Sequence, residues 1–125
     1  MSERQSTADL KWPLRIRQNR QQGVLVFILA GRVGRASADT LRHALEAAIE
    51  GGQQRLVIDF GSVDYLSSAG LPVLAAASNR LPGPHGALVL CALAEPVRVV
   101  FDLAGVLHHF VIESSRERAV ERAAR

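Results

Sequence analysis

The sequence predicts an α/β fold with a mixed β-sheet of four to five strands covered by about four helices. Short apolar runs of strand length alternate along the chain with longer stretches in which apolar residues recur every three or four positions. The strand-like runs are almost continuously apolar, as in strands that helices cover on both faces. With 125 residues, 48% of them hydrophobic, the chain has the size of one domain. We expect a flexible tail at residues 1–13 and a single domain over residues 14–123.

The first two strands and the first helix are predicted from the spacing of apolar residues, which differs between strands and helices. Residues 14–17 alternate as an edge strand, and residues 23–30 form a continuous apolar run typical of a central strand. We expect the glycine-containing residues 31–34 to end that strand. Ser37 or Asp39 can then cap a helix that stops at residues 51–52, both glycine. Its apolar residues share one face: Leu41, Ala44, Leu45, Ala48 and Ile49.

The middle of the chain repeats the pattern of strand followed by helix. Residues 56–60 form a strand, and residues 68–80 form a helix with Leu71, Leu74 and Ala75 on one face. The proline- and glycine-rich residues 81–86 form a turn, because neither residue type continues a regular element there. Residues 87–92 are a further buried strand.

The last elements are a helix, a short strand and a C-terminal helix. Pro96 suits the first helical position, and Gly105 ends the helix. The apolar face of this helix comprises Val97, Val100, Phe101 and Ala104. Residues 109–112 form the last strand. Ser114 or Ser115 then caps a helix that runs to about residue 122.

Composition argues against binding to nucleic acid or insertion into a membrane. The net charge is +3, but the C-terminal arginines are interleaved with Glu113, Glu117 and Glu121 in the spacing of a solvated helix. One tryptophan and one tyrosine are too few for a base-stacking platform. No signal peptide or run of 18 apolar residues occurs, so we expect a cytoplasmic protein without direct membrane insertion. The single cysteine, Cys91, lies in an apolar run and is expected in the core.

Enzyme chemistry has little support in the sequence. His108 and His109 are adjacent, but no third histidine or cysteine stands at the spacing of a zinc site. The residues around Ser68 do not form the Gly-x-Ser-x-Gly pattern of a nucleophile turn. We expect no catalytic residue, no metal and no cofactor.

One motif points to a function. Residues 63–71, Val-Asp-Tyr-Leu-Ser-Ser-Ala-Gly-Leu, follow a buried strand and place two serines at the start of a helix. Backbone N–H groups that lack helical partners, together with the helix dipole, favour an anion at such a position. The motif therefore suits a phosphate. The plain alternative is that Ser67 and Ser68 only cap the helix. Tyr65 can lie under this loop or form part of a binding face.

The chain has a strand, a glycine turn, a helix and a second strand, and this motif follows them. That order and the motif together resemble the STAS domain of bacterial anti-sigma-factor antagonists, and the resemblance covers roughly residues 14–123. The resemblance implies regulation by partner switching. Such antagonists bind an anti-sigma factor that is also a serine kinase, phosphorylation of a loop serine abolishes binding, and a phosphatase restores it. Ser68 aligns with the phosphorylated serine, with Ser67 as the second choice. The partner-binding residues implied are Arg32, Gly34, Asp64, Tyr65, Ser67, Ser68, Ala69, Gly70 and Leu71.

The chain departs from the family pattern at several positions. Ser67 and Gly34 stand where the family often has aspartate, and Ala69 stands where a second hydroxyl residue is common. Pro72 lacks an N–H group, so we expect the first helical turn to be distorted or to begin one or two residues later. Another function remains open on the same resemblance: a STAS module that scaffolds or regulates a membrane transporter of the lipid ATP-binding-cassette importer type.

Overall fold

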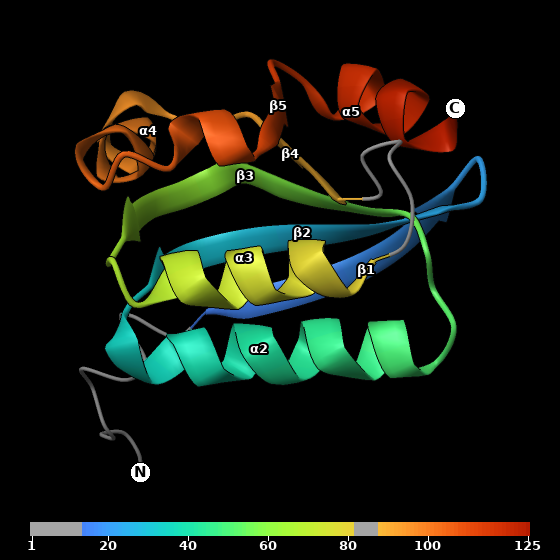
Figure 1. Ribbon diagram of the computed structural model, residues 1–125, viewed down its shortest axis with the longest axis horizontal. Coiled ribbons are helices and arrows are strands. Elements are labelled where there is room, and N and C mark those ends of the chain that lie inside the picture. The colour runs from blue at the N-terminus through green and yellow to red at the C-terminus, as the bar shows by residue number, and fades with distance from the viewer. Residues whose placement is uncertain (1–13, 82–87) are drawn as a thin grey trace, which may run out of the picture.

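The computed structural model describes residues 14–81 and 88–125, which form one five-stranded sheet (Figure 1). The strands lie side by side in chain order; β1 is antiparallel to β2, and all other neighbours are parallel. Their bounds are β1 (Arg15–Gln21), β2 (Val24–Val33), β3 (Leu56–Leu66), β4 (Leu88–Cys91) and β5 (Val111–Glu113). The predicted mixed sheet is confirmed. The predicted tail and most of the predicted turn at residues 81–86 lie outside the described residues.

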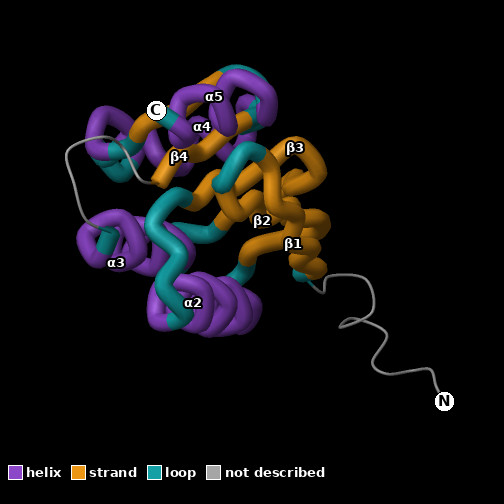
Figure 2. Tube along the Cα trace, turned by 90° about the vertical axis from the view of Figure 1, so that its right-hand side faces the viewer, coloured by secondary structure: helices purple, strands orange, loops and turns teal. Residues whose placement is uncertain are grey.

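The helices cover both faces of the sheet. They are α2 (Arg35–Glu50), α3 (Gly70–Arg80), α4 (Glu95–Leu103) and α5 (Arg116–Ala124), with a short 3-10 turn, η1, at Leu107–His109. α2 and α3 lie next to each other on one side of the strands (Figure 2). α4 contributes to the same apolar cluster, whereas α5 packs on the opposite face. Over residues 14–81 and 88–125, no helix is long and apolar enough to span a membrane.

The main core lies between the sheet and α2, α3 and α4. Alternate residues of β2 and β3 point into it, including Phe27 and Phe60. The Phe101 ring of α4 meets Phe60 edge-on with ring centroids 6.5 Å apart. Leu41 and Leu45 are buried in the same cluster, which confirms the predicted apolar face of the first helix.

The second face holds a thinner core of small residues. Val57, Val89 and Cys91 pack under Ala119 and Val120 of α5. Cys91 is fully buried as predicted, and this burial raises its pKa from 9.0 to about 12. Its thiol therefore stays protonated and unreactive at neutral pH.

Two strands are longer than the sequence indicated. β2 continues through Gly31 to Val33, and β3 continues past Phe60 to Leu66. The pairing shifts between Ile28 and Ala30 and again after Gly31, so β3 carries extra residues as bulges. Gly31 adopts a φ of +109°, which a glycine permits without strain. The predicted break at residues 31–34 is therefore wrong, because the glycine bends the strand without ending it.

Several element ends also differ from prediction. α2 begins after Gly34, so Ser37 is its third residue and Asp39 is an exposed ion-pair partner of Arg42. Pro96 occupies the second helical position, which equally needs no N–H group, and Ala104 is exposed beyond the end of α4. The last strand begins at Val111, because His109 belongs to η1.

Other predicted ends are confirmed. Gly51 ends α2, and Ser115 caps α5 by accepting a hydrogen bond from the Arg118 N–H at 3.2 Å. α3 begins at Gly70, two residues after Ser68, as expected from the position of Pro72.

Candidate functional site at the carboxyl edge of the sheet

The serine loop connects the carboxyl end of β3 to α3. The Ser67 N–H donates to the Val33 carbonyl at 2.8 Å, which ties the loop to the end of the neighbouring strand. The Ser67 hydroxyl accepts a hydrogen bond from the Ala69 N–H at 3.2 Å. The loop is thereby fixed at the edge where parallel strands end, a common place for ligand and partner sites in α/β folds.

The two adjacent serines have different surroundings. Ser67 is half-buried and hydrogen-bonded within the loop. Ser68 is exposed, and its hydroxyl makes no hydrogen bond to any residue in the described part of the chain. Ser67 therefore acts as a local turn-former, whereas the Ser68 hydroxyl is accessible to another protein.

The start of α3 offers fewer backbone donors than the sequence suggested. The Gly70 N–H donates to the Ser67 carbonyl at 3.0 Å, and the Leu71 N–H donates to the Ser68 carbonyl at 3.1 Å. Pro72 has no N–H group at all. The prediction of unpaired backbone N–H groups that could hold a phosphate is thus wrong at Gly70 and Leu71. Ser68 itself is exposed and lies just before the positive end of the α3 helix dipole.

The end of β2 and the start of α2 lie beside this loop. The Ser37 hydroxyl accepts from the Gly34 N–H at 2.8 Å and donates to the Arg32 carbonyl at 2.9 Å. Arg32 pairs in register with Tyr65, and its guanidinium lies 4.2 Å from the centre of the Tyr65 ring. Tyr65 is 40% exposed, so its ring belongs to the surface and does not lie under the loop.

The predicted site residues divide into surface and support. Arg32, Asp64, Tyr65 and Ser68 have exposed or half-exposed side chains at this edge. Gly34 caps α2, while Ser67 and Ala69 are half-buried parts of the loop. Gly70 and Leu71 are buried, so they shape the loop and offer no contact surface. A Cβ on Gly70 would lie 2.7 Å from the Leu66 Cδ1 atom, so any larger residue here would force the Leu66 side chain to shift.

Comparison with known proteins identifies the family. A family model described as the STAS domain matches residues 15–119. The chain belongs to the STAS domain family. The recognition made from the sequence is therefore confirmed.

Relatives of this STAS domain carry regulatory names. It is 39% identical over 106 residues to the putative anti-sigma factor antagonist BtrV of Bordetella bronchiseptica, covering 85% of this chain and 91% of that protein. An anti-sigma F factor antagonist of Paenibacillus polymyxa is 24% identical over 94 residues, covering 74% and 80%. A crystal structure of an anti-sigma factor antagonist from Mycobacterium paratuberculosis matches with a TM-score of 0.81 at 25% identity, over 90% of this chain and 95% of that one.

Sequence reasoning missed one ion pair in the STAS domain. Asp59 is the only buried charged or polar residue among those described, and its Oδ2 lies 2.7 Å from Arg116 Nε on α5. The other carboxylate oxygen accepts from the Gly61 N–H at 2.8 Å, at the first bulge of β3. The partner Arg116 lies 57 residues away in the chain. The available signal was an acid inside an apolar strand, which requires a partner when buried.

A cavity of about 520 Å³ lies beside α3. Leu71, Pro72 and Ala75 line one side, and Val106, His109 and Phe110 line the other. Among the described residues, this lining is mostly apolar and includes one titratable side chain, His109.

Proposed function

We propose that this STAS domain is an anti-sigma factor antagonist whose binding is switched off by phosphorylation of Ser68. The single observation that carries the site assignment is the contrast within the loop, where Ser67 is engaged and the Ser68 hydroxyl is exposed and unbonded. A kinase must reach the hydroxyl it modifies. Ser68 meets that requirement without any rearrangement of the loop.

The switch is a local change of charge on a binding surface. Phosphorylation adds about −1.5 to −2 charges and three strong acceptor oxygens. The N–H groups of Gly70 and Leu71 are already bonded to carbonyls, so they do not draw the phosphate inward. The charge therefore faces the partner. Against an apolar or acidic partner surface, a cost of about 3 kcal/mol already lowers affinity more than a hundredfold.

The partners follow from this role. The domain binds an anti-sigma factor with serine kinase activity and thereby releases the sigma factor, and a phosphatase acts on the modified serine. Arg32, Asp64 and Tyr65, which flank the loop, form the contact surface together with Ser68. In this role the protein works in the cytoplasm as a regulator and kinase substrate, without catalytic chemistry of its own. The names of its relatives support the proposal.

The test is a pull-down from the native cell extract, followed by phosphopeptide mass spectrometry. We expect wild type and Ser68→Ala to capture an anti-sigma factor, Ser68→Glu to capture at least about a hundredfold less, and phosphate to appear on Ser68. Ser114→Glu is the matched control, because Ser114 is also exposed but lies next to α5. Phosphate on Ser67 alone would contradict the site assignment. Stable capture of a transporter ATPase instead would contradict the proposed function.

A further inference from the structure

A second surface of the domain carries positive charge that its own acids do not neutralise. Arg15 and Arg17 on β1 border a cavity of about 260 Å³, which is also lined, among the described residues, by Ile28, Ala30 and Ser62. Register places these residues side by side: Arg15 pairs with Ala30, Arg17 with Ile28, and Ala30 with Ser62. The two arginines therefore stand on one face of the sheet, at the rim of an apolar floor.

This part of the sheet is left uncovered by the described helices. α5 covers the same face farther along, over Val24, Val26 and Val57. In Figure 2, β1 and β2 form an outer surface of the molecule on the side away from α2 and α3. Ile28 and Ala30 are only partly buried, although they belong to a central strand. An apolar strand surface of this kind gains from being covered by another chain.

The charges of Arg15 and Arg17 are not matched by an acid among the described residues. Within residues 14–81 and 88–125, neither side chain makes an ion pair or a hydrogen bond. The nearest acid in the same cross-strand row is Asp59, opposite Ile28, and its carboxylate is already bound to Arg116 at 2.7 Å. By contrast, Arg42, Arg80, Arg118 and Arg122 all pair with acids.

From this juxtaposition we propose that the Arg15–Arg17 groove, defined by Arg15, Arg17, Ile28, Ala30 and Ser62, binds an acidic, extended segment of a partner protein. Residues two apart on a strand are about 6.7 Å apart and point the same way. An extended peptide with acids at alternate positions presents its two carboxylates on one side and at the same spacing. Each carboxylate can meet one guanidinium in a bidentate ion pair.

The groove fits such a peptide better than it fits nucleic acid. Ile28 and Ala30 supply an apolar floor beside the arginines, and none of the described residues that line the cavity carries an aromatic ring for base stacking. Two arginines on a short strand also fall short of the continuous basic track that follows a phosphate backbone. The inference goes beyond the proposed Ser68 switch, because the groove lies on the sheet face and not on the loop at its edge.

The test uses labelled synthetic peptides and fluorescence anisotropy at low salt. We expect the full-length protein to bind a peptide containing Glu-Leu-Glu and to bind its Gln-Leu-Gln counterpart at least about tenfold more weakly. The double variant Arg15→Glu/Arg17→Glu should likewise lose at least about tenfold in affinity for the acidic peptide. A thermal melt checks that this variant is folded. Arg15→Gln/Arg17→Gln is the milder variant if the double reversal does not fold.

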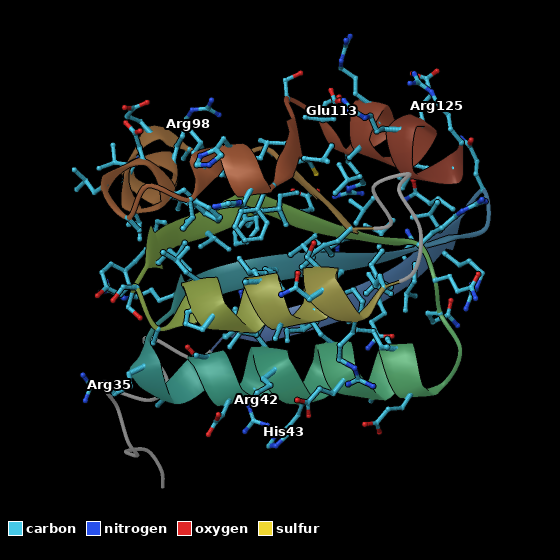
Figure 3. All side chains as sticks on the ribbon, viewed as in Figure 1. Arg35, Arg42, His43, Arg98, Glu113 and Arg125 are labelled. Atoms are coloured by element: carbon cyan, nitrogen blue, oxygen red, sulfur yellow. The ribbon has the colours of Figure 1, made fainter. Side chains whose placement is uncertain are left out.

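A matched control distinguishes specific binding in the Arg15–Arg17 groove from general attraction between the acidic peptide and a positively charged protein. Arg98→Glu/Arg125→Glu changes the net charge equally, and both arginines project from the surface on α4 and at the C-terminus (Figure 3). We expect this control to keep affinity within about twofold. An equal loss in both variants, no binding of the acidic peptide, or tighter binding of a short DNA duplex would each overturn the inference. Ser68→Glu should leave peptide binding unchanged, so failure here is distinguishable from failure of the phosphorylation switch.

Discussion

The carboxyl edge of the sheet and the face under α5 both carry polar side chains, but the surroundings of those side chains are opposite. At the edge, Ser68 is exposed and makes no internal hydrogen bond. Under α5, Asp59 is 6% exposed and is held by Arg116 and the Gly61 N–H. A change of charge at the edge therefore costs the fold little, whereas a change under α5 removes support from buried groups. The proposed binding surface and the buried ion pair that supports the fold therefore lie in different regions.

The largest effect on stability should come from breaking the pair under α5. Arg116→Met leaves the Asp59 carboxylate buried without its cation, so we expect the free energy of unfolding to fall by about 3 kcal/mol. Urea denaturation measures it. Asp59→Leu in the same chain removes the buried charge as well and should restore much of the loss. A loss below about 1 kcal/mol in Arg116→Met would show that the pair is not effectively buried.

A smaller effect is expected at the base of the serine loop. Gly70→Ala places a methyl group 2.7 Å from Leu66 Cδ1 and 3.2 Å from Val33 Cγ1, so it should lower the free energy of unfolding by about 1–3 kcal/mol. Denaturation of the double variant with Leu66→Val provides the check, because removing the Cδ1 atom should reduce the cost of the alanine. Equal costs in both backgrounds would mean that this contact is relieved elsewhere.

A still smaller change in the free energy of unfolding is expected at the two loop serines, which can be compared directly. Ser67→Ala removes the acceptor of the Ala69 N–H and should cost about 1 kcal/mol of unfolding free energy. Ser68→Ala removes no internal bond and should change it by less than about 0.5 kcal/mol. Parallel thermal melts of the two variants test the difference. If Ser68→Ala were the more destabilising, the hydroxyl of Ser68 would have a packing role.

The smallest effect concerns pH and the outer side of α5. Hydrogen bonds from Arg122 hold the pKa of Glu113 below its ordinary value of 4.5. A lowered folded-state pKa stabilises the protein above pH 4.5 and loses that contribution as the pH falls further. Glu113→Gln should therefore be less stable than wild type at neutral pH, with the gap closing in acid. If the difference in stability between wild type and Glu113→Gln stayed constant from neutral pH into acid, the pairing of Glu113 with Arg122 would be refuted.

The sequence predicted the sheet and the helices, because each depends on local periodicity, while the STAS family was recognised from the motif at residues 63–71. Leu41 and Leu45 repeat at helical spacing and are indeed buried on one face. It misjudged the ends of β2 and β3, because glycine ends many strands but here permits bulges that let pairing continue. Periodicity does not report such irregular pairing.

The site was less predictable than the fold. Ser67 and Ser68 are identical in chemistry, and only the hydrogen bond from the Ala69 N–H shows which one is engaged. The pairing of Asp59 with Arg116 depends on how α5 docks, and no local pattern specifies a contact between residues so far apart in the chain. The occupied N–H groups at Gly70 and Leu71 likewise follow from the exact start of α3.

The most direct test of the switch is the affinity of the captured anti-sigma factor for purified Ser68→Glu, measured by calorimetry beside wild type and Ser114→Glu. The account predicts that Ser68→Glu binds at least about a hundredfold more weakly, with an unchanged melting temperature, while Ser114→Glu binds like wild type. Wild-type affinity in Ser68→Glu would contradict it.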